Sequence, residues 1–274
     1  GALPSASTGG QIGTFEMILV TAVGGLLYAL FSGQPLVILG GTGPVLIFTA
    51  LLYRQCEHMG LPFLPVYAWV GLWAALFTII LAVTDASVFL RYVTRFTDEI
   101  FVLLMAGIFI EEAVINLTKE FKSDLLISYS TALSSVVLGC GTLAIAMVLR
   151  QFRRGTLLRS WARKFLADFG TVIAIGAMTL LATQMRDFTS LPHITVSTEI
   201  SVNAVDLMAA PTWVIFAAMV PAGFLAILIF FTQQITGRVI NAPQFKLKKG
   251  PGYHLDLLVV GVLMGLSSLF GLPW

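Results

Sequence analysis

Charged residues are scarce in this chain, and their scarcity excludes whole classes of protein. Only 11% of the 274 residues are Asp, Glu, Lys or Arg, while 57% are hydrophobic and the mean hydropathy is +0.91. Soluble domains carry roughly 25% charged residues. A net charge of +2 argues against a nucleic-acid partner, which requires a clustered basic face. The composition therefore predicts an integral membrane protein.

Cysteine and histidine are also few. Cys56 and Cys140 make no disulfide framework and have no metal-type spacing, and His58, His193 and His254 are scattered. No nucleophile is paired with a base in a pattern typical of a catalytic site. We therefore predict no metal, no other cofactor and no enzymatic activity.

Apolar runs recur along the chain at nearly the length of about 20 residues that a membrane-spanning helix needs. We predict eight spans: Phe15–Phe31, Pro35–Tyr53, Pro65–Val83, Ile100–Leu117, Ile127–Leu149, Phe169–Met185, Pro211–Ile235 and Leu257–Trp274. The sequence begins at Gly1 and stops inside an apolar run. These two features predict that it is a piece of a longer protein.

The basic residues predict the direction of each span, because short cytoplasmic loops collect Lys and Arg. If the Arg-rich loop 150–164 is cytoplasmic, strict alternation places twelve basic residues inside and four outside. The loop 186–210 then lies outside as a partly ordered cap. Residues 86–98 are expected to form an interfacial helix. The glycosylation-type triplet at residues 116–118 abuts a span, so we expect no modification there.

The second span cannot be one continuous helix. The stretch Gly33–Phe48 carries no charge, yet Pro35 and the run Gly40-Gly41-Thr42-Gly43-Pro44 interrupt it. In a helix interior each Gly costs about 1 kcal/mol and a Pro about 3 kcal/mol. We therefore predict an extended piece followed by a helix that starts at Pro44, where the missing N–H is not needed.

A helix that begins at membrane depth points its free N–H groups and the positive end of its dipole at whatever lies before it. Unpaired backbone groups are tolerated in a membrane only where protein buries them or where they line a wet cavity. We therefore predict that Thr42, Gly43 and Pro44 contact an anion, through backbone N–H groups and the Thr42 hydroxyl. The alternative is a packing kink, which gains little from the flanking Gly-Gly-Thr.

Two threonines on a later span share one face of their helix. Thr232 and Thr236 are four residues apart in an uncharged stretch. In one interpretation they meet an ion in the cavity. In the other, each hydroxyl bonds back to its own helix, and spacing alone does not decide between the two.

Carboxylates at membrane depth are costly and usually functional. We predict that Glu112 is buried and structural, that Glu111, Asp98 and Glu99 are interfacial, and that Asp256 is a helix-start acid.

Two segments of the chain echo each other. Val23–Pro35 and Val260–Pro273 each contain a glycine-dotted span that ends in Leu-Phe and leads to Gly-x-Pro, and the predicted topology runs them in opposite directions. An inverted-repeat transporter predicts such similarity, although Gly and Leu are common in membranes and chance is the alternative. The echo predicts a second broken helix just beyond Trp274.

Seven motifs follow one another along the chain: Ser32–Ile38 (SGQPLVI), Thr42–Phe48 (TGPVLIF), Arg95–Phe101 (RFTDEIF), Ile108–Ile110 (IFI), Asp168–Gly170 (DFG), Gln233–Thr236 (QQIT) and Lys248–Leu258 (KKGPGYHLDLL). Together they closely resemble the bicarbonate transporter family. That family comprises the chloride/bicarbonate anion exchangers, the sodium-bicarbonate cotransporters and the borate transporters.

The resemblance implies an all-α integral membrane fold of fourteen spans in two inverted halves of seven, with a core and a gate domain, usually as a homodimer in the plasma membrane. Residues 1–274 would be a partial transport domain: 1–235 hold most of the first repeat plus span eight, and 236–274 hold span nine and the entry to span ten. The substrate would lie between the half-helices of spans three and ten, flanked by spans one and eight. In this chain the resemblance assigns it to Thr42, Gly43, Pro44, Thr232 and Thr236.

One departure from the family pattern concerns ion coupling. Span eight of the family typically carries Asp in sodium-coupled members and Glu in exchangers, where this chain has Thr232. Thr49 likewise replaces an acid often found in span three. A sodium ion beside a carbonate requires such a carboxylate, so the departure argues against sodium coupling. The QQIT and KKGxGYHLD motifs are nevertheless most similar to the sodium-coupled branch.

The resemblance thus implies secondary active transport of bicarbonate, carbonate or a related small inorganic anion by alternating access, with chloride or sodium as a further transported ion. A borate transporter is the alternative within the family. An anion channel and a transport-inactive membrane scaffold are the alternatives outside that activity.

Overall fold

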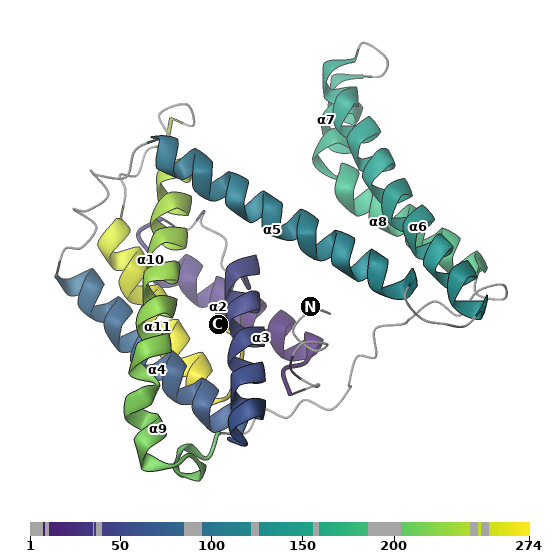
Figure 1. The fold of residues 1–274 in the computed structure, drawn as a ribbon. Coiled ribbons are helices and arrows are strands. Elements are labelled where there is room, and N and C mark those ends of the chain that lie inside the picture. The colour runs from purple at the N-terminus through teal and green to yellow at the C-terminus, as the bar shows by residue number, and fades with distance from the viewer. Residues whose placement is uncertain are drawn as a thin grey trace. The chain divides into compact units, whose positions relative to one another are not determined.

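The computed structural model describes residues 8, 11–34, 36, 40–84, 95–121, 126–155, 159–185, 204–241, 246–247 and 252–274. The described residues form helices and no strand (Figure 1), which confirms the predicted all-α class. The helices are α2 (Thr14–Phe31), α3 (Gly43–Met59), α4 (Phe63–Val83), α5 (Arg95–Phe121), α6 (Leu126–Gln151), α7 (Ser160–Asp168), α8 (Gly170–Gln184), α9 (Thr212–Ala217), α10 (Met219–Ile240) and α11 (Tyr253–Leu269), with short 3-10 turns η2 (Phe152–Arg154) and η4 (Leu207–Ala209).

These helices fall into two compact units. Unit 1 comprises Gly1–Ala106 and Thr195–Trp274 and holds α2, α3, α4, α9, α10 and α11. Unit 2 comprises Gly107–Ile194 and holds α6, α7 and α8, and the unit boundary falls within α5. All of the residues predicted to bind an anion belong to unit 1.

Helix α4 is the buried centre of unit 1 and packs mainly on α10 and α11. Val70, in its middle, is 0% exposed. A Cβ atom on Gly71 would collide with Ser268 Oγ, and one on Gly261 would lie 2.9 Å from Ile79 Cγ1. Because lipid provides no hydrophobic force between helices, such close approach of small residues supplies the van der Waals contact that holds membrane helices together.

The helices of unit 1 alternate in direction as the basic residues predict. Trp73 of α4 donates through Nε1 to the Ile215 carbonyl oxygen of α9, at 2.8 Å. Further along α4, near its end, Ala82 forms one buried cluster with Phe230 of α10 and Leu257 of α11. Helix α10 therefore runs parallel to α4, and α11, which begins beside the end of α4, runs antiparallel to it.

The two echoing segments also run in opposite directions. Tyr28, near the end of α2, clusters with Val259, near the start of α11. Still closer to the two helix ends, a Cβ atom on Gly33 would lie 2.8 Å from the Gly252 Cα atom. The antiparallel arrangement agrees with the predicted topology, while the inverted repeat itself stays a prediction.

Each predicted span contains a helix, but the helices differ in length. Four helical segments in the described ranges are long and apolar enough to cross a membrane, and α7 with α8 makes a fifth candidate that is bent by 67°. The four are Thr14–Phe31, Phe63–Val83, Thr131–Gln151 and Thr212–Ile240. Helices α3 and α11 have only 17 residues each. The protein is therefore a multi-pass integral membrane protein in which some apolar stretches hold shorter helices.

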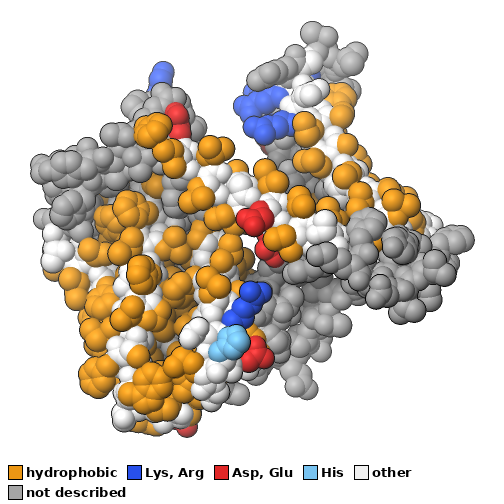
Figure 2. Space-filling model, in the orientation of Figure 1, with side chains coloured by type: hydrophobic (Ala, Val, Ile, Leu, Met, Phe, Trp, Pro, Cys, Tyr) orange, Lys and Arg blue, Asp and Glu red, His pale blue; other side chains and the backbone are white. Residues whose placement is uncertain are grey.

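The surfaces of both units are apolar. Leu30 and Phe224 in unit 1 are 70% and 69% exposed, and Val172 and Leu180 in unit 2 are 66% and 69% exposed. Figure 2 shows hydrophobic side chains over most of the visible surface at α4, α9 and α10. Large apolar side chains at such exposure fit a protein whose solvent is lipid.

The predicted end of the last span is wrong. Helix α11 stops at Leu269 instead of running to Trp274. Gly271 adopts φ 63°, and the Leu272 N–H donates to the Ser267 carbonyl oxygen at 2.9 Å. This is a Schellman ending, which only a residue without a Cβ atom adopts readily. The chain then turns back, and Trp274 stacks on Tyr67 with ring centroids 3.8 Å apart.

One prediction for the acidic residues needs correction. Glu112, expected to be buried, is half-buried, while Glu111 and Glu99 are exposed. Asp256 lies in the first turn of α11, which confirms it as a helix-start acid, although the N-cap residue is Gly252. Its carboxylate accepts from the backbone that follows α2.

Some predicted features lie outside the described residues. They are Pro35, the interfacial helix over residues 86–94, the outer loop over residues 186–203, and the side chains of Asp98 and Asn116.

Candidate functional site

The predicted break in the second span is present between α2 and α3. Helix α2 ends at Phe31, and α3 begins at Gly43, one residue before the predicted start at Pro44. Thr42 is the N-cap residue, with extended backbone at φ −85° and ψ 152°. Pro44 occupies the first turn, where its fixed φ favours the helix and its missing N–H is not required. The prediction of a broken helix is confirmed.

The start of α3 offers backbone donors that the helix itself does not use. The first N–H groups of an α-helix have no intrahelical partner, and here they belong to Thr42, Gly43 and Val45. The first helical bond runs from the Leu46 N–H to the Thr42 carbonyl oxygen, at 3.0 Å. Pro44 has no N–H to give, so it shapes this turn without donating to a ligand. Val45, which sequence reasoning missed, supplies the third donor.

The Thr42 hydroxyl is also left unpaired. A Thr at an N-cap normally accepts a bond from an N–H of the first turn, but Thr42 makes no such bond. Its Oγ1 atom is buried and has no hydrogen-bond partner in the structure. A buried hydroxyl without a partner costs about 1–3 kcal/mol. Donors left unpaired together at one helix start are the arrangement expected where a ligand binds.

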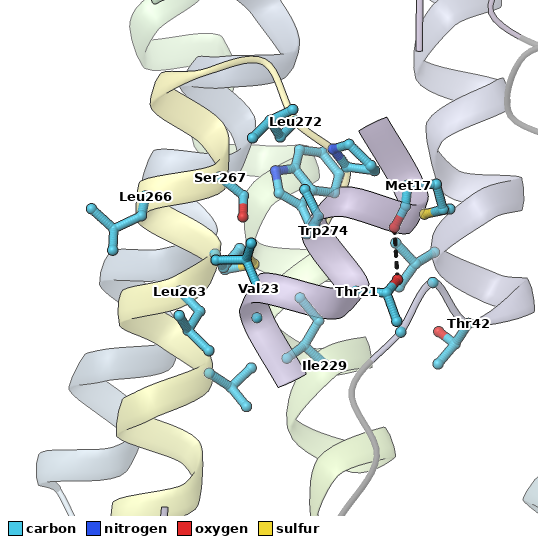
Figure 3. Close-up of a pocket in the computed structure, with 18 of the residues that line it drawn as sticks. Met17, Thr21, Val23, Thr42, Ile229, Leu263, Leu266, Ser267, Leu272 and Trp274 are labelled. Carbon is cyan, nitrogen blue, oxygen red and sulfur yellow. Dashed lines mark hydrogen bonds between the residues drawn. The ribbon is translucent and has the colours of Figure 1, made fainter. Parts of the chain in front are cut away.

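A cavity of about 440 Å³ in unit 1 meets this helix start (Figure 3). Its walls come from α2, α10, α11 and the residues after α11, with Thr42 and Val45 at the start of α3. Thr232 and Thr236 of α10 line the same cavity as Thr42. The structure therefore brings these three predicted residues around one cavity. Gly43 is buried behind the wall, and neither it nor Pro44 lines the cavity.

The hydroxyls of Thr232 and Thr236 bond back to their own helix. Thr232 Oγ1 donates to the Leu228 carbonyl oxygen, and Thr236 Oγ1 donates to the Thr232 carbonyl oxygen, each at 2.8 Å. This is the second of the two interpretations that spacing left open. Because each proton is used within α10, these hydroxyls present lone pairs rather than donors to the cavity.

Among the described residues that line the cavity, none has a charged side chain. Thr232 lies on its wall at the position where the family resemblance expects an acid. Thr49 is buried on α3 away from the cavity, where its hydroxyl donates to the Val45 carbonyl oxygen at 2.9 Å. The field at this end of the cavity therefore comes chiefly from the backbone of α3, whose N-terminus is equivalent to about +0.5 of an elementary charge.

Two further contacts hold the walls of the cavity together. Gln233, next to Thr232, is 8% exposed and donates through Nε2 to the Tyr28 hydroxyl of α2, at 2.7 Å. A Cβ atom on Gly41 would lie 2.6 Å from the Met17 Cε atom, so the glycine lets the broken segment lie against α2. Local sequence patterns carry no signal for either pairing, because the partners lie on distant segments.

Comparisons with known proteins agree with an all-α integral membrane domain. The model of the HCO3− transporter integral membrane domain matches residues 1–131 and 125–274. The whole chain is 35% identical over 298 residues to the Band 3 anion transport protein of Gallus gallus, and 35% identical over 320 residues to anion exchange protein 3 of Homo sapiens. Anion exchange protein 3 of Mus musculus is 35% identical over 316 residues. The chain spans 32% of the length of the first of these relatives and 26% of the other two.

Proposed function

This chain belongs to the bicarbonate transporter family, and on that basis we propose that it forms part of a secondary active transporter for bicarbonate or a related small inorganic anion. The observation that carries the proposal is the start of α3: Thr42, whose buried hydroxyl is unpaired, and Val45 line a cavity with no charged side chain among its described lining residues, and the first N–H groups of the helix have no intrahelical partner. The names of the relatives, an anion transport protein and anion exchange proteins, favour exchange of anions.

In the proposed complex the anion accepts from Thr42 Oγ1 and from the free N–H groups of α3. The walls around it are mainly apolar, with Met17, Val23, Leu263 and Trp274 among the lining residues. Apolar walls exclude water and lower the local dielectric, which strengthens the attraction between the helix dipole and the anion. The cavity is larger than one small anion, so we expect the anion to retain part of its hydration shell.

The uncharged site also favours exchange over net transport. An empty site that closes within the membrane buries the Thr42 hydroxyl and the free N–H groups without partners, which costs free energy. An occupied site closes with these donors satisfied. We therefore expect transitions of the loaded protein to be faster than those of the empty protein. In this scheme, alternating access opens the cavity of unit 1 to one side of the membrane and then to the other.

The wall composition supports transport without sodium coupling. A cation that travels with an anion needs a negative ligand nearby, and the cavity wall has Thr232 where the family typically has an acid. The backbone donors of α3 repel a cation rather than bind it. We therefore propose anion exchange in preference to sodium symport.

The proposal is tested by flux into proteoliposomes that contain the full-length protein. We expect uptake of isotopically labelled bicarbonate that saturates with concentration and accelerates when bicarbonate or chloride is present inside. Uptake that rises linearly without saturation or trans-acceleration would favour a channel, and uptake of borate alone would favour a borate transporter. If none of these anions crosses the membrane under any gradient, the transport proposal is contradicted and a membrane scaffold is the remaining alternative.

Homodimer formation and residence in the plasma membrane are implied by the family resemblance and stay predictions. Cross-linking of the protein in its native membrane tests the first, and surface labelling of intact cells tests the second.

A further inference from the structure

A buried polar cluster joins the end of α2 to the end of α10 and the start of α11. We name it the clasp and define it as Gly33, Gln34, Asn241, Gly252 and Asp256. Asp256 Oδ1 accepts from the Gly33 N–H at 2.7 Å and from the Gln34 N–H at 3.0 Å. Gln34 Nε2 donates to Asn241 Oδ1 at 3.0 Å. Asp256 and Gln34 are each only 2% exposed, so water does not compete for these bonds.

The backbones that meet in the clasp are in direct contact. A Cβ atom on Gly252 would lie 2.7 Å from the Gly33 Cα atom, so both positions need the absence of a side chain. The approach places the Asp256 carboxylate, one turn beyond Gly252, against two N–H groups that follow the end of α2. Ser32, the C-cap of α2, still bonds back to the Tyr28 carbonyl oxygen at 2.8 Å. Gly33 and Gln34 are therefore the first residues of the broken segment.

We propose that Asp256 is a positioning residue for the anion site at the start of α3. The broken segment runs from Gly33 to Thr42, and Asp256 holds its first two N–H groups. Gln34 precedes Thr42 by only eight residues. Fixing one end of so short a stretch of chain restricts where its other end can lie. That other end carries the Thr42 hydroxyl and the N-terminus of α3.

The clasp also sets the position of α10, which carries the opposite wall of the cavity. Asn241 is the C-cap residue of α10, and it ties that helix to Gln34. Two turns earlier, Gln233 ties α10 to Tyr28 of α2. Thr236 lies on α10 between Gln233 and Asn241, and Thr232 lies next to Gln233. One cluster therefore fixes both sides of the proposed site, although its functional meaning rests on the proposed transport.

The acceptor atom, rather than the charge, carries the proposed role. The two N–H groups bond to Oδ1, while Oδ2 is buried and has no partner. Asn keeps an oxygen in the place of Oδ1 and removes the buried charge. Ala removes the acceptor altogether. The pair of substitutions therefore separates the loss of the clasp from the loss of the charge.

The experiment measures the half-saturation concentration and the maximal rate of bicarbonate uptake in proteoliposomes of the full-length protein. Asp256→Ala should raise the half-saturation concentration about tenfold, because the Gly33 and Gln34 N–H groups both lose their acceptor. Asp256→Asn should stay within about twofold of the wild type, since its oxygen still accepts both bonds. A change confined to maximal rate, with half-saturation unchanged, would mean that Asp256 only stabilises the fold.

Thr78→Val is the matched control. Thr78 is 0% exposed, its hydroxyl has no partner, and it lies on α4 off the cavity wall. We expect its half-saturation concentration to equal that of the wild type. If Asp256→Ala does not reach the membrane, Asn241→Ala is the milder lesion of the same clasp. It removes the bond from Gln34 and one bond to the Gly237 carbonyl oxygen of its own helix, and it leaves the carboxylate. It should raise the half-saturation concentration about threefold.

If Asp256→Ala has the wild-type half-saturation concentration, the positioning role is overturned and the proposed function is left intact. The same holds for Asn241→Ala if Asp256→Ala does not fold. Absence of anion flux in the wild-type protein instead overturns the proposed function, and the positioning role falls with it.

Discussion

The two ends of the broken segment between α2 and α3 differ in how their polar groups are paired. At the first end, the Gly33 and Gln34 N–H groups both bond to the buried carboxylate of Asp256. At the second end, the Thr42 hydroxyl is equally removed from water but has no partner. Protein groups bind the backbone donors at the first end, whereas the first N–H groups of α3 at the second end have no intrahelical partner.

This difference separates a binding site from a packing kink. A packing kink gains nothing from unused donors beside a cavity, because each buried unpaired group costs free energy. A site needs one rigid end and one open end. Variants of the open end should therefore abolish transport in a folded protein, whereas variants of the anchored side should weaken binding or stability by smaller amounts.

The largest expected effect comes from Gly43→Leu at the open end. Gly43 is buried at the first position of α3, so a leucine there must displace the helix start or fill the space before it. We expect bicarbonate flux to fall below detection while the protein still inserts into the membrane. Proteoliposome flux, normalised to inserted protein, measures the change.

Gly176→Leu is the matched control for that substitution. A Cβ atom on Gly176 of α8 meets nothing within 4 Å, so a leucine has room there. Its flux should equal that of the wild type. Wild-type flux in Gly43→Leu as well would show that the break serves packing alone.

A smaller but more specific effect is expected from Thr232→Asp on the facing wall. The substitution places a carboxylate on a cavity wall whose described side chains are all uncharged. A carboxylate there attracts a cation, so replacing choline outside by sodium should raise bicarbonate uptake on the order of tenfold, the effect of about 1.4 kcal/mol.

Thr179→Asp is the control for the added charge, because Thr179 lies exposed on α8 in unit 2. Wild-type uptake should be indifferent to sodium. If Thr232→Asp is equally indifferent, the argument that the missing carboxylate prevents sodium coupling is wrong.

The smallest effect is expected on the anchored side, from Tyr28→Phe. The Tyr28 hydroxyl accepts from Gln233 Nε2 between α2 and α10, and both residues are buried. Its loss leaves a buried amide unpaired, at a cost of about 1–3 kcal/mol in the free energy of unfolding. Thermal unfolding of the purified protein should begin a few degrees lower.

Tyr53→Phe provides the comparison for that variant. Tyr53 is half-buried on α3 and keeps its ring contact with Phe63, at 5.2 Å between centroids, when the hydroxyl is removed. Its unfolding temperature should match the wild type. An equal decrease in both variants would assign the effect to general loss of tyrosine hydroxyls rather than to the tie between α2 and α10.

Local chemistry is what made the break and the helix start predictable. Three glycines and a proline around Thr42 disfavour a continuous helix whatever surrounds them, so the start of α3 was placed within one residue. Apolar length and the distribution of basic residues likewise predicted the helices of unit 1 and their alternating directions. Long motifs in order along the chain identified the family without any knowledge of contacts.

Pairings between distant segments were not predictable in this way. Asp256 has the position of a helix-start acid, but its partners are 223 and 222 residues away. The end of α11 depends on the left-handed conformation of Gly271 inside an apolar run whose composition alone predicts more helix. Val45 belongs to the site because Pro44 has no N–H to donate. This follows only once the first residue of α3 is known.

The flux of two variants at Thr42 decides whether an anion binds where α3 begins. Thr42→Ser keeps the hydroxyl, and Thr42→Val keeps the shape but removes the donor. In proteoliposomes with equal inserted protein, we expect trans-accelerated bicarbonate uptake to persist in Thr42→Ser and to be lost in Thr42→Val. Equal uptake in Thr42→Val and the wild type would contradict an anion site at the start of α3.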